Sequence, residues 1–272
     1  MNKSLRLTES AVMIAIAFVL SMLRVVDMPF GGSVTAFGML PLVIIAYRYK
    51  IKWGLLAGLT FSALKLVMGL RNLSYATSAT AGVAIILLDY IVAFTIIGLA
   101  GVLRGKVKDH GTALAGGALI ACTARYACHV IVGCTVWAGV SIPSTDGLIF
   151  SMAYNASYMV PETLLTVIGA YFAGKAFTLT EPRVKRVPME RSSLINIYTA
   201  IPVSLGTVIS FIMLFGMMQT KEGFDITAVA NADIYRWITL AAVFAVGILS
   251  GLILRISLKQ SIVSEPADIE IQ

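Results

Sequence analysis

The stretch RYACHVIVGCTVW, residues 125–137, places an arginine, a histidine and a tryptophan inside a run of apolar residues. The surrounding run, residues 112–139, is long enough to cross the roughly 30 Å hydrocarbon core of a bilayer as an α-helix. A charged side chain at the centre of such a helix costs at least about 2.5–3.5 kcal/mol and is by default a candidate for function. The stretch therefore predicts a membrane helix that also forms one wall of a site.

The composition extends this prediction to the whole chain. Apolar residues make up 58% of the 272 positions and charged residues only 13%, whereas a soluble domain carries about 25% charged residues. We therefore expect an all-α polytopic membrane protein. Apolar runs of suitable length predict eight spans, at residues 9–26, 35–48, 53–70, 80–103, 112–139, 149–176, 195–218 and 236–256.

The basic residues give the expected orientation. Of the 21 Lys and Arg residues, fifteen fall in the loops on one side of the predicted spans and four on the other, with Lys65 and Arg125 inside spans. Basic loops face the cytoplasm in membrane proteins, so we expect both termini on the cytoplasmic side of a bacterial plasma membrane. Topology thus accounts for the net charge of +7, and nucleic acid is not needed to explain it.

One break in composition divides the chain. The segment EPRVKRVPMERSS, residues 181–193, is basic and contains two prolines. We expect a six-span membrane domain at 1–178, a basic cytoplasmic linker at 179–193, two additional helices at 194–258 and a polar tail at 259–272. The three cysteines share one apolar run without CxxC spacing, so they indicate packing residues and no metal site.

Polar residues on three predicted helices converge at one membrane depth. In the predicted orientation Asp89, His129 and Asn155 all lie in the outer half of the bilayer. At about 100° per residue, Tyr126, His129, Gly133 and Trp137 share one helix face, and we expect Gly133 to leave room for a flat group. Aromatic side chains on such a face suit a flat ring or a cation.

Structural interpretations compete with this one. Arg125 and Asp89 would form a buried ion pair, His129 a hydrogen bond between helices, and Asn155 a polar contact between helices. Trp137, taken alone, is typical of the membrane–water interface. Lys65 receives no role. The sequence has no HExxH, GxSxG or Walker A motif, so it predicts neither an enzyme nor an ATPase.

The chain resembles the thiamine-specific S component, the substrate-binding membrane subunit, of energy-coupling factor (ECF) vitamin transporters. The resemblance is carried by LTESAVMIAIAF (7–18), GGSVTAFGMLP (31–41), LLDYIVAFTIIGLAGVLRGK (87–106), RYACHVIVGCTVW (125–137) and FSMAYNASY (150–158). It covers about residues 7–176. The last two spans have no counterpart in the compact six-helix members of the family.

The resemblance implies a substrate site, a lid and a partner surface. The implied substrate-binding residues are Asp89, Tyr90, Arg125, His129, Trp137, Phe150, Tyr154 and Asn155. Some family members carry Glu in place of Asp89 and Tyr in place of Phe150. The implied lid over the pocket is the loop Pro29, Phe30, Gly31, Gly32 and Ser33, and the small residues Ala11 and Ala15 would meet the transmembrane coupling subunit.

The implied function is high-affinity capture of extracellular thiamine, without a cofactor, for ATP-driven uptake. A coupling subunit and two ATPase subunits would be separate chains. A stand-alone proton-coupled secondary transporter for a cationic aromatic metabolite is the main alternative, using Asp89 and His129 for proton coupling. Uptake of a thiamine precursor such as the hydroxymethylpyrimidine, or of a phosphate ester, is also open. In a structural subunit or membrane enzyme, the polar cluster would only join helices.

Overall fold

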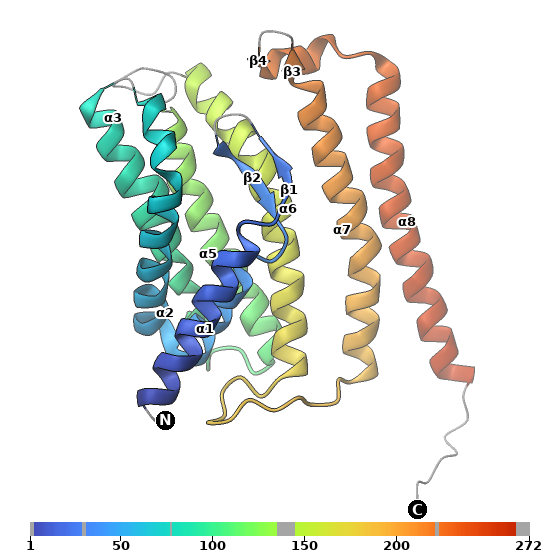
Figure 1. Ribbon diagram of the computed structural model, residues 1–272. Helices are drawn as coiled ribbons and strands as arrows, with labels where there is room; N and C mark the ends of the chain where they lie inside the picture. The colour runs from blue at the N-terminus through green and yellow to red at the C-terminus, as the bar shows by residue number, and fades with distance from the viewer. Residues whose placement is uncertain (1–2, 29–30, 77, 135–144, 221–222, 265–272) are drawn as a thin grey trace, which may run out of the picture. The chain divides into compact units, whose positions relative to one another are not determined.

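A computed structural model describes residues 3–28, 31–76, 78–134, 145–220 and 223–264. The chain divides into two compact units, Met1–Val187 and Pro188–Gln272. The first unit holds helices α1, α2, α5 and α6 together with a segmented helix at residues 79–101 (Figure 1). Their bounds are Lys3–Leu20, Leu40–Gly69, His110–Val132 and Thr145–Ala176. Helix α5 packs along α6, and α1 packs on α2.

The segmented helix changes its hydrogen-bonding pattern three times. It begins as α3, Ala79–Ala84, and widens to the π-helical η3, Ile85–Val92. It then narrows through α4, Ala93–Thr95, to the 3₁₀ segment η4, Ile96–Gly101. Short π-helical segments are rare and are frequent at functional sites. Here the π-helical segment carries Asp89 and Tyr90.

Helix α2 is broken at Lys50, between the predicted spans 35–48 and 53–70. Lys50 has φ 69° and ψ 168°, which no helix accommodates. A Cβ added to Gly54 would lie 2.6 Å from the Cβ of Ala46, although residues eight apart in a straight helix are separated by about 12 Å. The chain therefore reverses at Lys50. Arg104 donates to the carbonyl oxygens of Tyr47, at 3.0 Å, and of Arg48, which the break leaves without helical partners.

A β-hairpin follows α1 where the first predicted span was expected to continue to residue 26. Helix α1 ends at Leu20, and β1, Arg24–Asp27, pairs antiparallel with β2, Ser33–Thr35. The prediction was wrong because strand pairing, rather than helix, satisfies the backbone of this segment. Arg24 and Asp27 are exposed and ion-paired at 2.8 Å.

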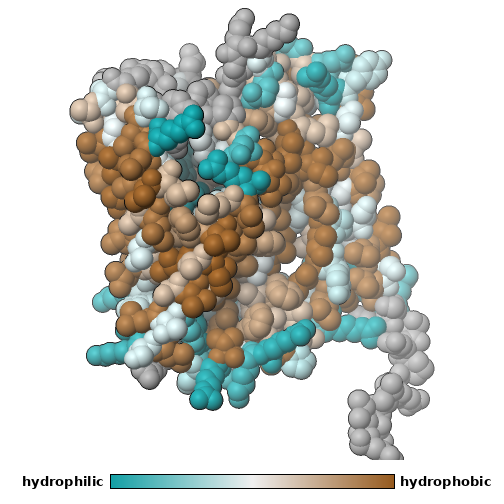
Figure 2. Space-filling model, viewed as in Figure 1, coloured by the Kyte–Doolittle hydropathy of each residue, from teal (hydrophilic) through white to brown (hydrophobic). Residues whose placement is uncertain are grey.

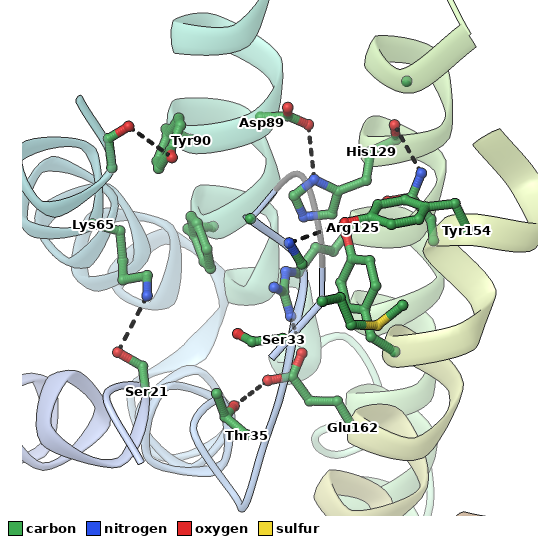
Figure 3. A pocket seen from close by; sticks show the side chains of 18 of the residues that line it. Ser21, Ser33, Thr35, Lys65, Asp89, Tyr90, Arg125, His129, Tyr154 and Glu162 are labelled. Carbon is green, nitrogen blue, oxygen red and sulfur yellow. Dashed lines mark hydrogen bonds and ion pairs between the residues drawn. The ribbon is translucent and has the colours of Figure 1, made fainter. Parts of the chain in front are cut away.

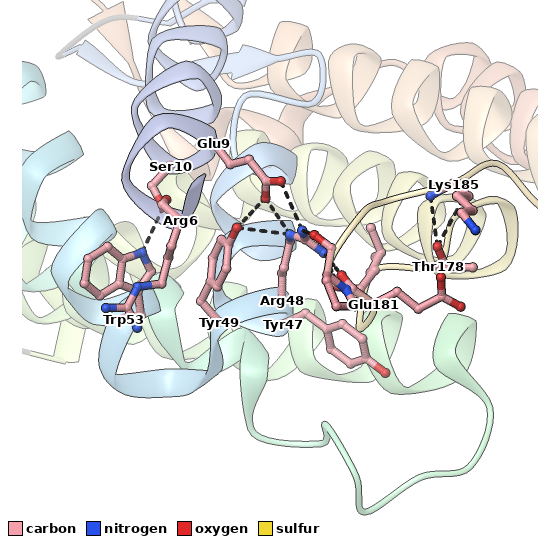
Figure 4. Close-up of polar contacts among 12 residues, drawn as sticks. Arg6, Glu9, Ser10, Tyr47, Arg48, Tyr49, Trp53, Thr178, Glu181 and Lys185 are labelled. Atoms are coloured by element: carbon pink, nitrogen blue, oxygen red, sulfur yellow. Dashed lines mark hydrogen bonds and ion pairs between the residues drawn. The ribbon is translucent and has the colours of Figure 1, made fainter. Parts of the chain in front are cut away.

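A buried arginine ties together the end of this unit that holds the α2 break (Figure 4). Arg48 is 4% exposed, and all three of its nitrogens donate hydrogen bonds. Its partners are the Glu9 carboxylate of α1, the Tyr49 hydroxyl and the carbonyl oxygens of Leu179, Glu181 and Pro182. Arg48 therefore fixes α1, α2 and the segment after α6 to one another.

Long apolar helices recur through the described part of the chain. Five are long and apolar enough to cross a membrane: Leu40–Gly69, Ala79–Gly101, His110–Val132, Arg191–Met217 and Ile234–Gln260. On the face shown in Figure 2, hydrophobic side chains cover the middle of the helices of the first unit, and hydrophilic side chains gather toward their ends. This pattern is that of a protein surrounded by lipid.

The second unit is a pair of helices in contact through small residues. Helices α7, Arg191–Met217, and α8, Ile234–Ser264, are joined by the short strands β3, Gln219–Thr220, and β4, Gly223–Phe224, and by η6, Ile226–Asn231. A Cβ on Gly206 would lie 2.9 Å from the Cα of Gly247, and one on Gly251 would lie 3.0 Å from the Thr199 carbonyl oxygen. Such close approach of backbones is typical of membrane helix pairs.

Candidate functional site

A cavity of about 650 Å³ opens between the β-hairpin, α2, η3, α5 and α6 (Figure 3). Its size is within the range of small-molecule sites, roughly 300–1,000 Å³. Most of the expected site residues line it: Gly31, Gly32, Ser33, Asp89, Tyr90, Arg125, His129, Phe150, Tyr154 and Asn155. Trp137, Pro29 and Phe30 lie outside the described residues. The structure thus brings together residues that are up to 124 positions apart in the sequence, from Gly31 to Asn155.

Asp89 and His129 form a pair across η3 and α5. The Nδ1 atom of His129 lies 2.8 Å from the Oδ1 atom of Asp89, and both side chains are largely buried. Nδ1 carries the proton in this contact, so the other ring nitrogen of a neutral His129 is an acceptor. That atom, Nε2, is buried and has no partner within the described chain. The two residues of the pair line the cavity, and one ring nitrogen of His129 is left without a hydrogen-bond partner among the described residues.

Arg125 pairs with Glu162 and not with Asp89, which corrects the proposed Arg125–Asp89 ion pair. The Nη1 atom of Arg125 donates to Glu162 Oε2 at 2.7 Å, and both residues are buried. Thr35 of β2 donates its hydroxyl to the other oxygen of Glu162. Glu162, about one helical turn beyond Tyr158 on α6, therefore connects the hairpin to α5. The Nε atom of Arg125 has no partner among the described residues.

Aromatic side chains form the α6 wall of the cavity. The rings of Phe150 and Tyr154 are parallel, with centroids 6.1 Å apart, and Tyr154 meets Tyr158 edge to face at 5.7 Å. The Tyr154 hydroxyl accepts a hydrogen bond of 3.1 Å from the backbone nitrogen of Gly32. A Cβ on Gly32 would lie 2.7 Å from that hydroxyl, so only glycine permits this approach of the hairpin to α6.

Gly133 lines the cavity, but its Cβ side is closed, which corrects the expectation that this glycine leaves room there for a flat group. A Cβ at this position would lie 2.1 Å from the Ser151 hydroxyl oxygen. The space is therefore filled by α6, whose Ser151 donates to the Val130 carbonyl oxygen at 2.8 Å. Tyr126 of the same face donates to the carbonyl oxygen of Met152 and is not among the residues that line the cavity.

Asn155 and Tyr90 are held by bonds within the protein. The Asn155 amide donates to the Ser151 carbonyl oxygen at 2.8 Å and accepts from the Tyr158 hydroxyl at 2.6 Å. The hydroxyl of Tyr90 donates to the Gly69 carbonyl oxygen at 3.1 Å. Both residues line the cavity. The Tyr90 bond joins η3 to α2, whereas the Asn155 bonds lie within α6, apart from a longer one of 3.4 Å to the His129 carbonyl oxygen on α5.

Sequence reasoning missed several lining residues. Thr35, Tyr158 and Ser151 are common residue types in apolar surroundings, and no spacing marks them. Lys65 was singled out as a charge at membrane depth but received no role, and it lines the cavity. The small residues Ala11 and Ala15 are exposed on α1, opposite its buried residues Ser10, Ile14 and Ala17. They face away from the site.

Comparisons with known proteins agree with the resemblance in the sequence. Residues 7–180 match the family described as thiamine transporter protein. The thiamine transporter ThiT of Bacillus subtilis (strain 168) is 33% identical over 182 residues, which are 62% of this chain and 91% of that protein. The solved structure of ThiT from Listeria monocytogenes aligns with a TM-score of 0.51 and 25% identity, covering 63% of this chain and 94% of the other. The prediction of a thiamine-specific S component is confirmed, and the chain belongs to the thiamine transporter family of multi-pass membrane transporter proteins, which are not enzymes.

Proposed function

We propose that this cavity captures thiamine from outside the cell with high affinity. The observation that carries the proposal is the Asp89–His129 pair, whose Nε2 atom is buried and unsatisfied among the described residues, in a cavity also lined by the stacked rings of Phe150 and Tyr154. A buried polar atom without a partner costs about 1–3 kcal/mol. A ligand that donates a hydrogen bond to this atom recovers that cost, so the Asp89–His129 pair favours a polar heterocycle.

Thiamine has the chemistry that these walls can hold. Its thiazolium ring is a cation, and its aminopyrimidine ring carries an amino group and ring nitrogens. Asp89 would balance the cation or accept from the amino group, and the His129 Nε2 atom would accept a second hydrogen bond. Phe150 and Tyr154 present parallel rings on which a flat heterocycle would stack. The attraction between a cation and the face of such a ring contributes about 0.5–2 kcal/mol.

The energy for uptake would come from other chains. We propose that the protein works with an ECF coupling subunit and two ATPase subunits, in the cytoplasmic membrane of a bacterium, with both of its termini in the cytoplasm. The exposed residues Ala11 and Ala15 on α1 would form the contact, because small side chains let helices approach closely. Residues 1–178 would form the six-span substrate-binding domain, and residues 194–258 the two additional spans.

Calorimetric titration of the purified, detergent-solubilised full chain with thiamine tests the capture step. We expect saturable binding at one site, with riboflavin and biotin at the same concentrations giving no binding. Saturable binding of riboflavin or biotin, with none of thiamine, would contradict the substrate assignment. The hydroxymethylpyrimidine alone is a further ligand in this series, and we expect it to bind more weakly because it lacks the thiazolium cation.

Uptake of labelled thiamine separates the ECF mechanism from a proton-coupled secondary transporter. We expect accumulation in cells only when this chain is produced together with a coupling subunit and ATPases, and no effect of an uncoupler at constant ATP. Accumulation by this chain alone that an uncoupler abolishes would establish the secondary transporter instead. Changing Ala11 and Ala15 to Leu should prevent accumulation while thiamine binding persists.

A further inference from the structure

The ion pairs around the cavity leave two cations without a carboxylate. The charged residues in its described lining are four bases, Arg24, Lys65, Arg71 and Arg125, and three acids, Asp27, Asp89 and Glu162. Two acids are paired with an arginine, Asp27 with Arg24 and Glu162 with Arg125. Asp89 is hydrogen-bonded to His129 and is the carboxylate that would face the cation of a ligand. Within the described lining, no carboxylate pairs with Lys65 or Arg71.

Lys65 lies at membrane depth, and the protein compensates its charge only weakly. It is partly buried on α2, and its Nζ atom donates one long hydrogen bond of 3.4 Å to the Ser21 hydroxyl. The same atom lies 5.9 Å from the centroid of Phe94, whose ring also lies 4.8 Å from the Arg125 guanidinium. An ammonium group at such depth costs several kcal/mol unless it is paired. An anion brought by a ligand would pair it.

The cavity has room for such a group beside Lys65. In Figure 3 Lys65 stands on the α2 wall, across the cavity from Tyr154 on α6. A smaller hollow of about 300 Å³ continues from the main cavity and shares Ser21, Arg24, Asp27, Lys65 and Met68 with it. A ligand whose rings lie against α5 and α6 would therefore extend its other end toward Lys65.

We propose that Lys65, with Ser21 beside it and Arg71 at the rim, forms an anion subsite for the phosphate of a thiamine phosphate ester. The proposal rests on the proposed function, because the rings of thiamine would occupy the Asp89–His129 side. A phosphomonoester carries about −1.5 to −2 charges at pH 7, which matches the two uncompensated cations. With the thiazolium balanced by Asp89, thiamine itself leaves both cations unpaired.

Binding of thiamine and of thiamine monophosphate to the purified full chain tests the subsite. In Lys65→Gln we expect the affinity for the monophosphate, divided by that for thiamine, to fall at least tenfold, which is about 1.4 kcal/mol. Lys65→Arg should restore the ratio, because it retains the charge. Lys52→Gln, an exposed lysine on the same helix, is the matched control and should leave the ratio unchanged.

A ratio that Lys65→Gln leaves unchanged, whether both affinities fall equally or neither falls, overturns the subsite. Absence of thiamine binding by the unmodified chain would instead remove the proposed function.

The unmodified protein gives a second test that does not depend on a variant. Added salt should weaken binding of the monophosphate more than binding of thiamine, because salt screens the attraction between the phosphate and the two cations. Equal salt dependence of the two affinities would contradict the proposal. Inorganic phosphate should compete with the monophosphate and leave thiamine unaffected. If inorganic phosphate instead strengthens thiamine binding, the subsite takes a free anion and the ester proposal is wrong.

Discussion

Two buried arginines of the first unit, Arg48 and Arg125, differ in how completely they are paired. Arg48 donates from all three nitrogens to Glu9, a hydroxyl and three backbone carbonyls. Arg125 is equally buried but has one carboxylate partner, and its Nε atom has none within the described residues. The first arrangement is complete without a ligand, and the second is not.

The difference separates a structural cluster from a binding site. Buried polar groups in folded proteins are nearly always hydrogen-bonded, and an exception requires an explanation. At the cavity two such exceptions, on Arg125 and His129, occur together in one lining. We therefore expect changes at Arg48 to affect mainly stability, and changes at the cavity to affect mainly ligand binding.

Replacement of Arg48 should give the largest effect on stability. Arg48→Ala removes the donor of three carbonyl oxygens and leaves the half-buried Glu9 carboxylate with only the Tyr49 hydroxyl. Hydrogen bonds from a charged group contribute about 1.5–3 kcal/mol each. We expect a large fall in the thermal midpoint in detergent. Thiamine affinity, measured well below the midpoint, should stay within about threefold, a change of less than 1 kcal/mol. Lys52→Ala, exposed on the same helix, is the control.

A stable Arg48→Ala protein that fails to bind thiamine would break the comparison, because the cluster would then belong to the site. A midpoint equal to that of the control would show that the network contributes nothing to stability.

Closing the space at Gly32 should have an intermediate effect, confined to binding. In Gly32→Ala the added Cβ meets the Tyr154 hydroxyl and the Tyr158 ring, so the hairpin loses its hydrogen bond to α6. One such bond contributes about 0.5–1.5 kcal/mol. We expect thiamine to dissociate roughly three to ten times faster, as measured by stopped-flow fluorescence. In the matched Gly216→Ala variant the new Cβ meets nothing within 4 Å, and the rate should not change.

The ion pair between Asp109 and Lys175 should give the smallest effect, and one that depends on pH. Burial raises the pKa of Asp109, but hydrogen bonds from Lys175 and Thr112 outweigh it and lower the pKa from 3.8 to about 2. The pair therefore stabilises the fold above pH 3.8, and this contribution is lost as the pH falls toward 2. Asp109→Asn keeps the cap to Thr112 but removes the charge.

We expect Asp109→Asn to lower the free energy of unfolding by about 0.2–1 kcal/mol at neutral pH, with no difference from the unmodified chain near pH 2. Thermal unfolding across this range measures the effect. A loss of stability in Asp109→Asn that is the same at every pH would show that the carboxylate charge is not its cause.

Most long helices could be predicted because they follow from hydropathy. The expected convergence of Asp89, His129 and Asn155 is seen as one cavity lining. The β-hairpin was missed, because four apolar and charged residues after α1 look the same in a sequence whether they extend a helix or begin a strand. The π-helical turn that carries Asp89 leaves no compositional signal at all.

Pairing was the least predictable feature of the site. Arg125 and Asp89 were expected at similar membrane depth, but depth alone does not say which carboxylate an arginine faces. Glu162 is 37 residues from Arg125, and only the packing of α5 against α6 makes them partners. The space at Gly133 was likewise misjudged, because a glycine opens room for whichever neighbour is nearest, and here that neighbour is Ser151.

The most direct test of the account is a thiamine titration of the unmodified chain and of Asp89→Asn, with the thermal midpoint of each measured in the same detergent. Asn keeps the size of the side chain but removes the charge that faces His129 and the cavity. We predict saturable binding by the unmodified chain and at least tenfold weaker binding by the variant, about 1.4 kcal/mol, at nearly equal midpoints. Equal affinities at equal midpoints would contradict the account and make the Asp89–His129 pair a contact between helices only.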